Sequence, residues 1–137
     1  MDTYNQQNLV DEINLTRSLL DSLERQITAA DKAYQDMSTT LAVIKERGSI
    51  AASETRISIG SGMFLKGNLD VSGNIIIPIG SDIYIEATTE EAVKRIETNL
   101  DNLRKSLEGL LDRQAELRIR HDDLLAIAQN IGNQEQK

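Results

Sequence analysis

The side chains able to do acid–base or metal chemistry are few. The single histidine, His121, is followed directly by Asp122 and Asp123. Side chains share a helix face only at spacings of three or four residues, so these neighbours diverge from the imidazole. A catalytic or metal-binding histidine needs partners that face it. We therefore interpret His121 as a structural residue of a helix seam, where polar residues set the register at a cost in stability.

A glycine-rich segment, GSGMFLKG, is the nearest approach to a phosphate-binding loop. It lacks the Gly-Lys-Ser/Thr ending of that motif, and its glycines suit a β-hairpin turn rather than the start of a helix. The acidic pair Glu90 and Glu91 fits the first turn of a helix behind a Thr88 or Thr89 cap. The sequence predicts no enzyme, no cofactor and no metal site.

The composition narrows the class of partner. The formal charge is -7, with basic residues interspersed among acids, whereas nucleic-acid binding needs clustered Lys and Arg. We expect no nucleic acid partner. The sequence has no cysteine, no secretory signal at its first residues and no apolar run long enough for a membrane span. We expect a soluble, cytoplasmic protein with no membrane partner.

The elements that must position any functional surface are separated by helix breakers. Pro78, the only proline, and six of the eight glycines lie between residues 48 and 80. The flanks are free to be helical, at residues 5–47 and 89–131. Residues 54–87 form the insert, and residues 1–137 are expected to form a single domain.

Both flanks carry the apolar spacing of a coiled coil. The first seam is Leu9, Ile13, Thr16, Leu20, Leu23, Ile27, Ala30, Tyr34, Met37, Leu41 and Ile44. The second seam is Val93, Ile96, Leu100, Leu103, Leu107, Leu110, Gln114, Leu117, His121, Leu124, Ala128 and Ile131. The alternative, two helices of a compact bundle, usually demands a wider apolar face. Equal lengths predict an antiparallel hairpin with Leu9 near Ala128.

The insert contains two similar segments, ISIGSGMFLKG and IPIGSDIYIEA. Alternating apolar residues around Gly-Ser-Gly and Gly-Ser-Asp predict two tandem β-hairpins, so the fold class is α+β. Pro78 belongs at an edge, a strand end or a bulge. Two-stranded hairpins are marginal alone, so we predict subunit assembly through Ile57, Ile59, Phe64, Leu65, Ile75, Ile77, Ile79, Ile83, Tyr84 and Ile85. The alternative is that the hairpins pack on each other and cap the coil.

The block ETRISIGSGMFLKGNLDVSGNIIIPIGSDIYIEATTEEAVKRIE between two heptad helices resembles the alpha class of prefoldin subunits, in its archaeal form. Beta-class members carry one hairpin instead of two. The resemblance implies that two alpha and four beta subunits join into a β-barrel platform from which coiled coils extend. It also implies that the coil tips bind unfolded polypeptides and deliver them to a group II chaperonin without ATP. Ser58 stands where the family often has proline, so the entry strand of the first hairpin departs from the family pattern at this position.

The residues near the free ends of the helices support a client surface. Leu15, Leu19, Leu111 and Ile119 fall outside the seams, as do several residues nearer the tips. Exposed apolar surface rimmed by charge usually marks an interaction site. The predicted client-binding residues are Leu9, Val10, Ile13, Leu124, Leu125, Ile127 and Ile131. Alternatively, some of them mark where the helices splay or contact a neighbouring coil.

Two functions remain open at this point. One is an ATP-independent chaperone subunit of a hetero-hexamer. The other is a structural protein that self-assembles through its hairpins into a ring or filament, with the coiled coils as spacers. Apolar tips are explained only by the first, and assembly without a second kind of subunit is expected only from the second.

Overall fold

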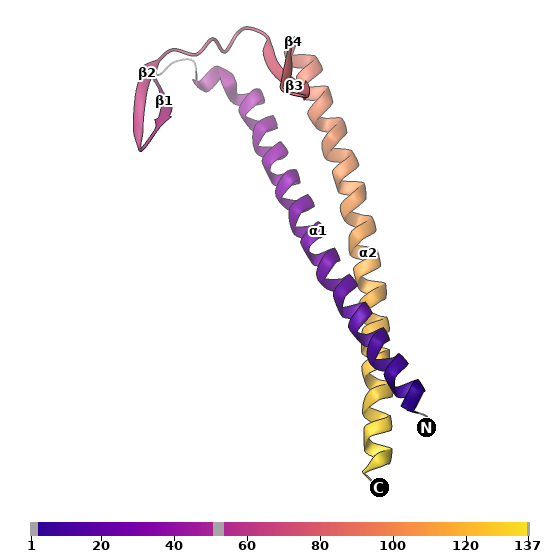
Figure 1. The fold of residues 1–137 in the computed structure, drawn as a ribbon. Coiled ribbons are helices and arrows are strands. Elements are labelled where there is room, and N and C mark those ends of the chain that lie inside the picture. Colours follow the sequence, from indigo (N-terminus) through magenta and orange to yellow (C-terminus); the bar gives the residue numbers. More distant parts are fainter. Residues whose placement is uncertain (1–2, 51–53, 137) are drawn as a thin grey trace. The chain divides into compact units, whose positions relative to one another are not determined.

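The computed structural model describes residues 3–50 and 54–136 and shows two long helices with two β-hairpins between them (Figure 1). The element order is α1 (Thr3–Ile50), β1 (Thr55–Gly60), β2 (Met63–Gly67), β3 (Ile75–Gly80), β4 (Ile83–Ala87) and α2 (Thr89–Glu135). The predicted α+β class is confirmed.

Both helices extend further than the heptad seams predict. Helix α1 has 48 residues and continues past Gly48, and α2 has 47 residues and continues past Gly132. A single helical glycine costs only about 1 kcal/mol relative to alanine, which a long helix tolerates. Among the described residues, neither helix has a segment apolar enough to cross a membrane.

Helix α2 begins with a reciprocal cap. The Glu91 backbone N–H donates to the Thr88 hydroxyl oxygen at 3.2 Å, and the Thr88 N–H donates to the Glu91 carboxylate at 3.1 Å. These two bonds satisfy donors that have no partner within the helix. Of the two threonines expected as the cap, the structure selects Thr88.

The chain divides into two compact units. The first contains the residues up to Ala33 and those from Leu103 onward. In it, the helices run antiparallel, because Glu12 pairs with Arg120 while Gln6, earlier in α1, bonds to Glu135, later in α2. Its buried residues are seam residues, Ile13, Thr16, Leu23 and Leu124.

The second unit, Tyr34–Asn102, contains both hairpins and the helix segments next to them, which we call the helix roots. Its predicted seam residues on the helices, from Tyr34 to Ile44 and from Val93 to Leu100, are half-buried. Lys45 and Glu97 approach to 3.6 Å, with both side chains more than half exposed. Exposed pairs of this kind add little stability, so the apolar seam is the main contact between these helix segments.

The two hairpins repeat one backbone. Ser58 pairs with Phe64 and Pro78 with Tyr84, and each register is interrupted at the next residue along, before Gly60 and Gly80. Both glycines have positive φ, 103° and 112°, a region that favours glycine. Pro78 therefore lies beside a bulge in a two-stranded sheet, as predicted.

An Asx turn shapes the link between the hairpins. One carboxylate oxygen of Asp70 accepts hydrogen bonds from the Ser72 hydroxyl at 2.9 Å, the Ser72 N–H at 3.1 Å and the Gly73 N–H at 3.2 Å. The Ser72 hydroxyl, then the two backbone donors, lower the pKa of the Asp70 carboxyl below its ordinary value.

Candidate assembly and client-binding surfaces

Each hairpin has two faces, because successive side chains of a strand alternate. We name the two faces of each hairpin by whether their residue numbers are odd or even. The odd faces carry Thr55, Ile57, Leu65 and Gly67 in the first hairpin and Ile75, Ile77, Ile85 and Ala87 in the second. The even faces carry Arg56, Ser58, Phe64 and Lys66 in the first and Ile76, Pro78, Tyr84 and Glu86 in the second. The odd faces are apolar in both hairpins, whereas the even faces differ in charge.

The odd face of the second hairpin is partly covered. Ala87 is 3% exposed and Ala92, in the first turns of α2, is 1% exposed. Residues 75–78 of β3 line a groove with Ile44 of α1 and Ile96 of α2. The Arg95 guanidinium donates to the Pro78 carbonyl oxygen at 3.3 Å. The second hairpin is therefore packed against the helix roots.

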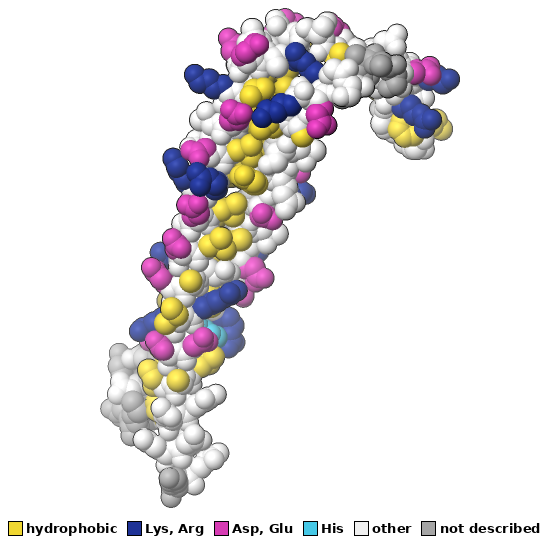
Figure 2. Space-filling view, turned by 180° about the vertical axis from the view of Figure 1, so that it is seen from behind, with side chains coloured by type: hydrophobic (Ala, Val, Ile, Leu, Met, Phe, Trp, Pro, Cys, Tyr) yellow, Lys and Arg dark blue, Asp and Glu magenta, His cyan; other side chains and the backbone are white. Residues whose placement is uncertain are grey.

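The first hairpin leaves its apolar side chains open. Ile57 and Leu65, which face each other across the strands, are 43% and 57% exposed. Hydrophobic side chains of this hairpin are visible beside Lys and Arg side chains on the face drawn in Figure 2. A two-stranded sheet with both apolar partners exposed needs further cover for stability.

The structure places the predicted assembly residues in two groups. Eight are exposed: Ile57, Ile59, Phe64, Leu65, Ile79, Ile83, Tyr84 and Ile85. Ile75 and Ile77 are half-buried, because they line the groove beside the helices. Three further exposed apolar residues, Met63, Leu69 and Ile76, were not predicted. Strict alternation around Ile75 and Ile77 would have placed Ile76 on the opposite face.

The predicted client residues lie in the first unit but differ in burial. Val10 and Ile127 are 49% and 48% exposed. Leu9, Leu125 and Ile131 are half-buried. Ile13 and Leu124 are buried at 9% and 3%. These last two are seam residues, and helix-to-helix packing removes them from the free surface.

A shallow groove opens where the two helix ends meet. Its lining is mainly apolar or small: Leu9, Val10, Ala128, Ile131 and Gly132, with Gln6 and Glu135 as polar members. Leu9 and Ala128 therefore lie close together, as the antiparallel register predicts. Leu15, Leu19, Leu111 and Ile119 add exposed apolar side chains in the same unit, from 38% to 64% exposed.

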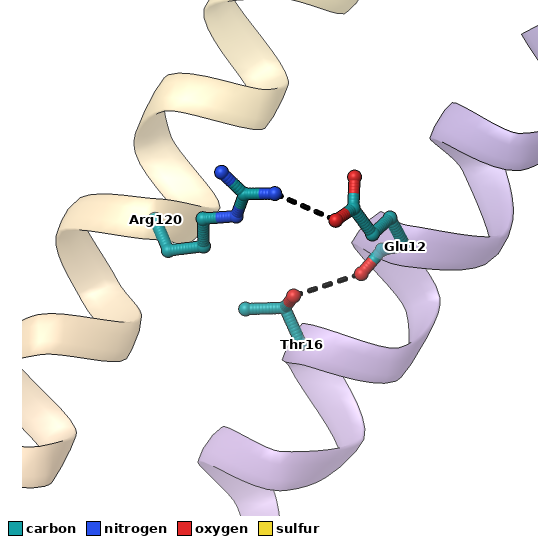
Figure 3. Close-up of polar contacts among 3 residues, drawn as sticks. All are labelled: Glu12, Thr16 and Arg120. Atoms are coloured by element: carbon teal, nitrogen blue, oxygen red, sulfur yellow. Dashed lines mark hydrogen bonds and ion pairs between the residues drawn. The ribbon is translucent and has the colours of Figure 1, made fainter. Parts of the chain in front are cut away.

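A polar cluster holds the register near these surfaces (Figure 3). Arg120 contacts the Glu12 carboxylate at 2.6 Å, and the Thr16 hydroxyl donates to the Glu12 carbonyl oxygen at 2.8 Å. Thr16 is 6% exposed, and its bond to the preceding turn satisfies its hydroxyl inside an apolar seam. The Nε2 atom of His121 is buried without a hydrogen-bond partner.

Within residues 3–50 and 54–136, no three His, Asp or Glu side chains converge to hold a metal ion. What the geometry presents instead are apolar surfaces at the hairpins and at the helix ends.

Comparison with known proteins gives consistent matches. Residues 11–134 match the family described as Prefoldin subunit. The prefoldin subunit alpha of Thermoplasma acidophilum is 36% identical over 106 residues, which is 77% of this chain and 82% of that protein. Prefoldin subunit alpha of Thermoplasma volcanium is 35% identical over 88 residues, 64% of this chain and 68% of the relative.

One solved structure has a similar fold. A chain of the filamentous PFD from Methanocaldococcus jannaschii, determined by cryo-EM, superimposes with a TM-score of 0.70 at 21% identity, covering 85% of this chain and 97% of that one. At this identity the likeness concerns the fold alone.

Two long helices flank a pair of β-hairpins whose apolar side chains are largely exposed, which is a coiled-coil subunit fold. The chain belongs to the prefoldin family, as an alpha-class subunit. It is a chaperone subunit, and members of this family form oligomeric complexes with other prefoldin subunits. Prefoldin subunits are chaperone cofactors.

Proposed function

We propose that this chain is a subunit of an ATP-independent holding chaperone, which binds non-native polypeptide at the helix ends and delivers it to a group II chaperonin. The proposed complex contains two copies of this chain and four beta-class subunits, as the family resemblance implies, and acts in the cytoplasm. The hairpins are the proposed assembly surface, with the predicted residues from Ile57 to Ile85 in its contacts.

The observation that carries this proposal is the set of exposed apolar side chains in the first unit. Val10, Ile119 and Ile127 are each about half exposed or more, at 49%, 64% and 48%. Isolated surface apolar residues are ordinary, but here they accompany an apolar groove at the helix ends. Each side chain buried in a client contributes roughly 1.5–3 kcal/mol before ordering costs.

Weak single contacts suit a holding function. A client that touches several helix ends at once gains from their effective concentration, although each contact alone is readily released. Ile13 and Leu124, which are buried, join the client surface in this proposal only where the helix ends separate.

The test is suppression of aggregation of an unfolding model protein by the assembled complex. We expect Val10→Ser with Ile119→Ser and Ile127→Ser to lose most of the protection, with complex mass unchanged by light scattering. A matched control is Val43→Ser, since Val43 is 51% exposed but belongs to the other unit. Equal protection by both variants would refute the helix ends as the client surface.

A second candidate function is a self-assembling structural ring or filament. Two observations favour it: the exposed hairpins, and the likeness to a chain of a filamentous assembly. This function predicts that the chain alone forms large, open-ended particles. Sedimentation of the chain with and without a beta-class subunit separates the two, because a chaperone subunit should yield a complex of one fixed mass with that partner.

A further inference from the structure

A pocket opens in the second unit, between the last turns of α1 and the link that joins the two hairpins. Its volume is about 240 Å³. Its half-buried walls include Ile44, Val71 and Ile75, and Val43 and Leu69 also line it and are each 51% exposed. A cavity of about 150 Å³ holds a benzene ring. The pocket therefore has room for one apolar side chain and a small group attached to it.

One charged side chain of this pocket has a buried donor that the chain does not use. Arg47 lies in the last turn of α1 and lines the pocket. Its Nη1 atom is buried and, within the described part of the chain, has no hydrogen-bond partner. A buried donor without an acceptor costs free energy. A guanidinium meets this need best with a carboxylate, which it binds through two parallel hydrogen bonds.

The other polar residues of the pocket restrict which carboxylate fits. Asp70 also lines it, and one oxygen of its carboxylate is held by Ser72 and Gly73. A ligand with a second negative charge would be repelled by Asp70, so a monocarboxylate is favoured.

A side-chain amide at the pocket favours a peptide over a simple aliphatic acid. Asn74 lines the pocket, and its amide oxygen can accept a hydrogen bond from a peptide N–H. The last residue of a polypeptide offers an apolar side chain, one carboxylate and one N–H together. An internal Asp or Glu offers the carboxylate but leaves the apolar walls empty, and a free fatty acid has no N–H for the amide.

We propose that this pocket binds the C-terminal residue of a polypeptide when that residue is apolar, with its carboxylate on the Arg47 guanidinium. The side chain of that residue packs among Ile44, Val71 and Ile75, and the Asn74 amide oxygen accepts its N–H. Because a single residue buries little area, we expect a dissociation constant of roughly 1 mM.

This site is independent of the proposed function. It belongs to the second unit, whereas the proposed client surface lies in the first. A weak contact with one chain end does not replace the several contacts of that client surface.

The test measures binding of short peptides to the full chain by NMR, from the shifts of the Val43 and Val71 methyl groups and the Gly73 amide. The probe is acetyl-Gly-Gly-Leu with a free carboxyl end. Its C-terminal amide should bind at least roughly tenfold more weakly, because it loses the charged acceptor. Acetyl-Gly-Gly-Gly keeps the carboxylate but has no side chain, and it should also bind at least roughly tenfold more weakly.

Two variants separate the carboxylate contact from the apolar contact. Arg47→Gln removes the charge and should bind the free acid and the amide equally, within about twofold. Leu69→Ser should weaken binding of both probes by about threefold and leave the preference for the acid unchanged. The matched control is Arg56→Gln, at an exposed arginine of β1, which should bind as the natural chain does. Circular dichroism checks the helices of every variant.

Four results would overturn the proposal. They are equal binding of acid and amide by the natural chain, an unchanged preference in Arg47→Gln, the same loss of preference in Arg56→Gln, and no shift of the pocket signals at roughly 20 mM of probe, well above the expected dissociation constant. If isocaproate, a free aliphatic acid, binds as tightly as the peptide, the polypeptide end is overturned as the occupant. Protection from aggregation by the helix ends does not enter this assay, so failure here leaves the proposed function standing.

Discussion

The two hairpins share a register and a turn geometry, yet only the second is packed against helices. Ala87 of the second hairpin is 3% exposed, while the first hairpin keeps Ile57 at 43% and Leu65 at 57%. The connection explains the difference. Strand β4 runs into α2 through the single residue Thr88, whereas α1 ends at Ile50 and β1 begins at Thr55. The single-residue connection holds the second hairpin close to its helix.

The largest expected effect comes from placing a charge at equivalent positions of the two hairpins. Ala87→Asp buries a carboxylate without a partner against the helix roots and should lower the free energy of unfolding by about 3 kcal/mol. Gly67→Asp, at the equivalent position, should cost less than about 1 kcal/mol, because a Cβ there meets only the flexible end of the Ile57 side chain, at 3.1 Å.

Urea unfolding of the isolated chain, followed by circular dichroism, measures the free energy of unfolding of both variants. An equal decrease in the two variants would show that the first hairpin is packed as firmly as the second in solution. If neither variant is destabilised, the second hairpin is not packed against the helices in solution.

A smaller effect is expected from shortening equivalent isoleucines. Ile77→Ala removes a half-buried side chain beside the helices and should destabilise the isolated chain by about 1–2 kcal/mol. Ile57→Ala removes a side chain that is 43% exposed, so it should cost under about 1 kcal/mol. Thermal unfolding of the isolated chain reports the order of these two variants.

In the assembled complex the order should reverse, since Ile57 is then buried by a partner and Ile77 is already packed. Complex mass as a function of dilution measures this second effect. If Ile57→Ala leaves the dissociation of the complex unchanged, the odd face of the first hairpin is not in the subunit interface.

The smallest expected effect concerns the link between the hairpins. The pKa of the Asp70 carboxyl is lowered in the folded chain. The carboxylate therefore stabilises the turn above the ordinary pKa of aspartate, roughly 4. This contribution is lost as the pH falls through the lowered pKa, when the protonated carboxyl gives up its strongest acceptor bonds. NMR titration of the Ser72 and Gly73 amides should show a shared inflection below the ordinary value for aspartate.

Asp70→Asn is the control for that titration, because its amide oxygen still accepts hydrogen bonds but does not ionise. The inflection should vanish in this variant. An inflection that persists would assign the titration to another carboxyl group.

Much of the architecture could be predicted because it rests on short-range periodicity. Seam residues from Leu9 to Ile131 recur at spacings of three and four, and all of them are buried or half-buried. The hairpin turns could be predicted equally well, since Gly60 and Gly80 supply the positive φ that each bulge needs. Helix ends were less accurate, because apolar spacing stops before the polar last turns of α1 and α2 do.

The candidate surfaces could be predicted from the sequence only in part. Ile13 and Leu124 belong to the seam pattern and are buried, so their place among client residues conflicted with the periodicity that predicted the coil. Ile76 is not among the predicted assembly residues, because that set follows the alternation of Ile75, Ile77 and Ile79; Ile76 lies on the opposite face of the strand and is exposed.

Patterns within short stretches of the sequence predict the two seams and the repeated hairpin, because helix and strand periods and turn residues act over a few neighbours. Which hairpin is covered, and which apolar residues at the helix ends stay exposed, depends on tertiary contacts. Those outcomes depend on contacts between residues far apart in the chain, such as Pro78 with Arg95 and Glu12 with Arg120, which no local pattern encodes.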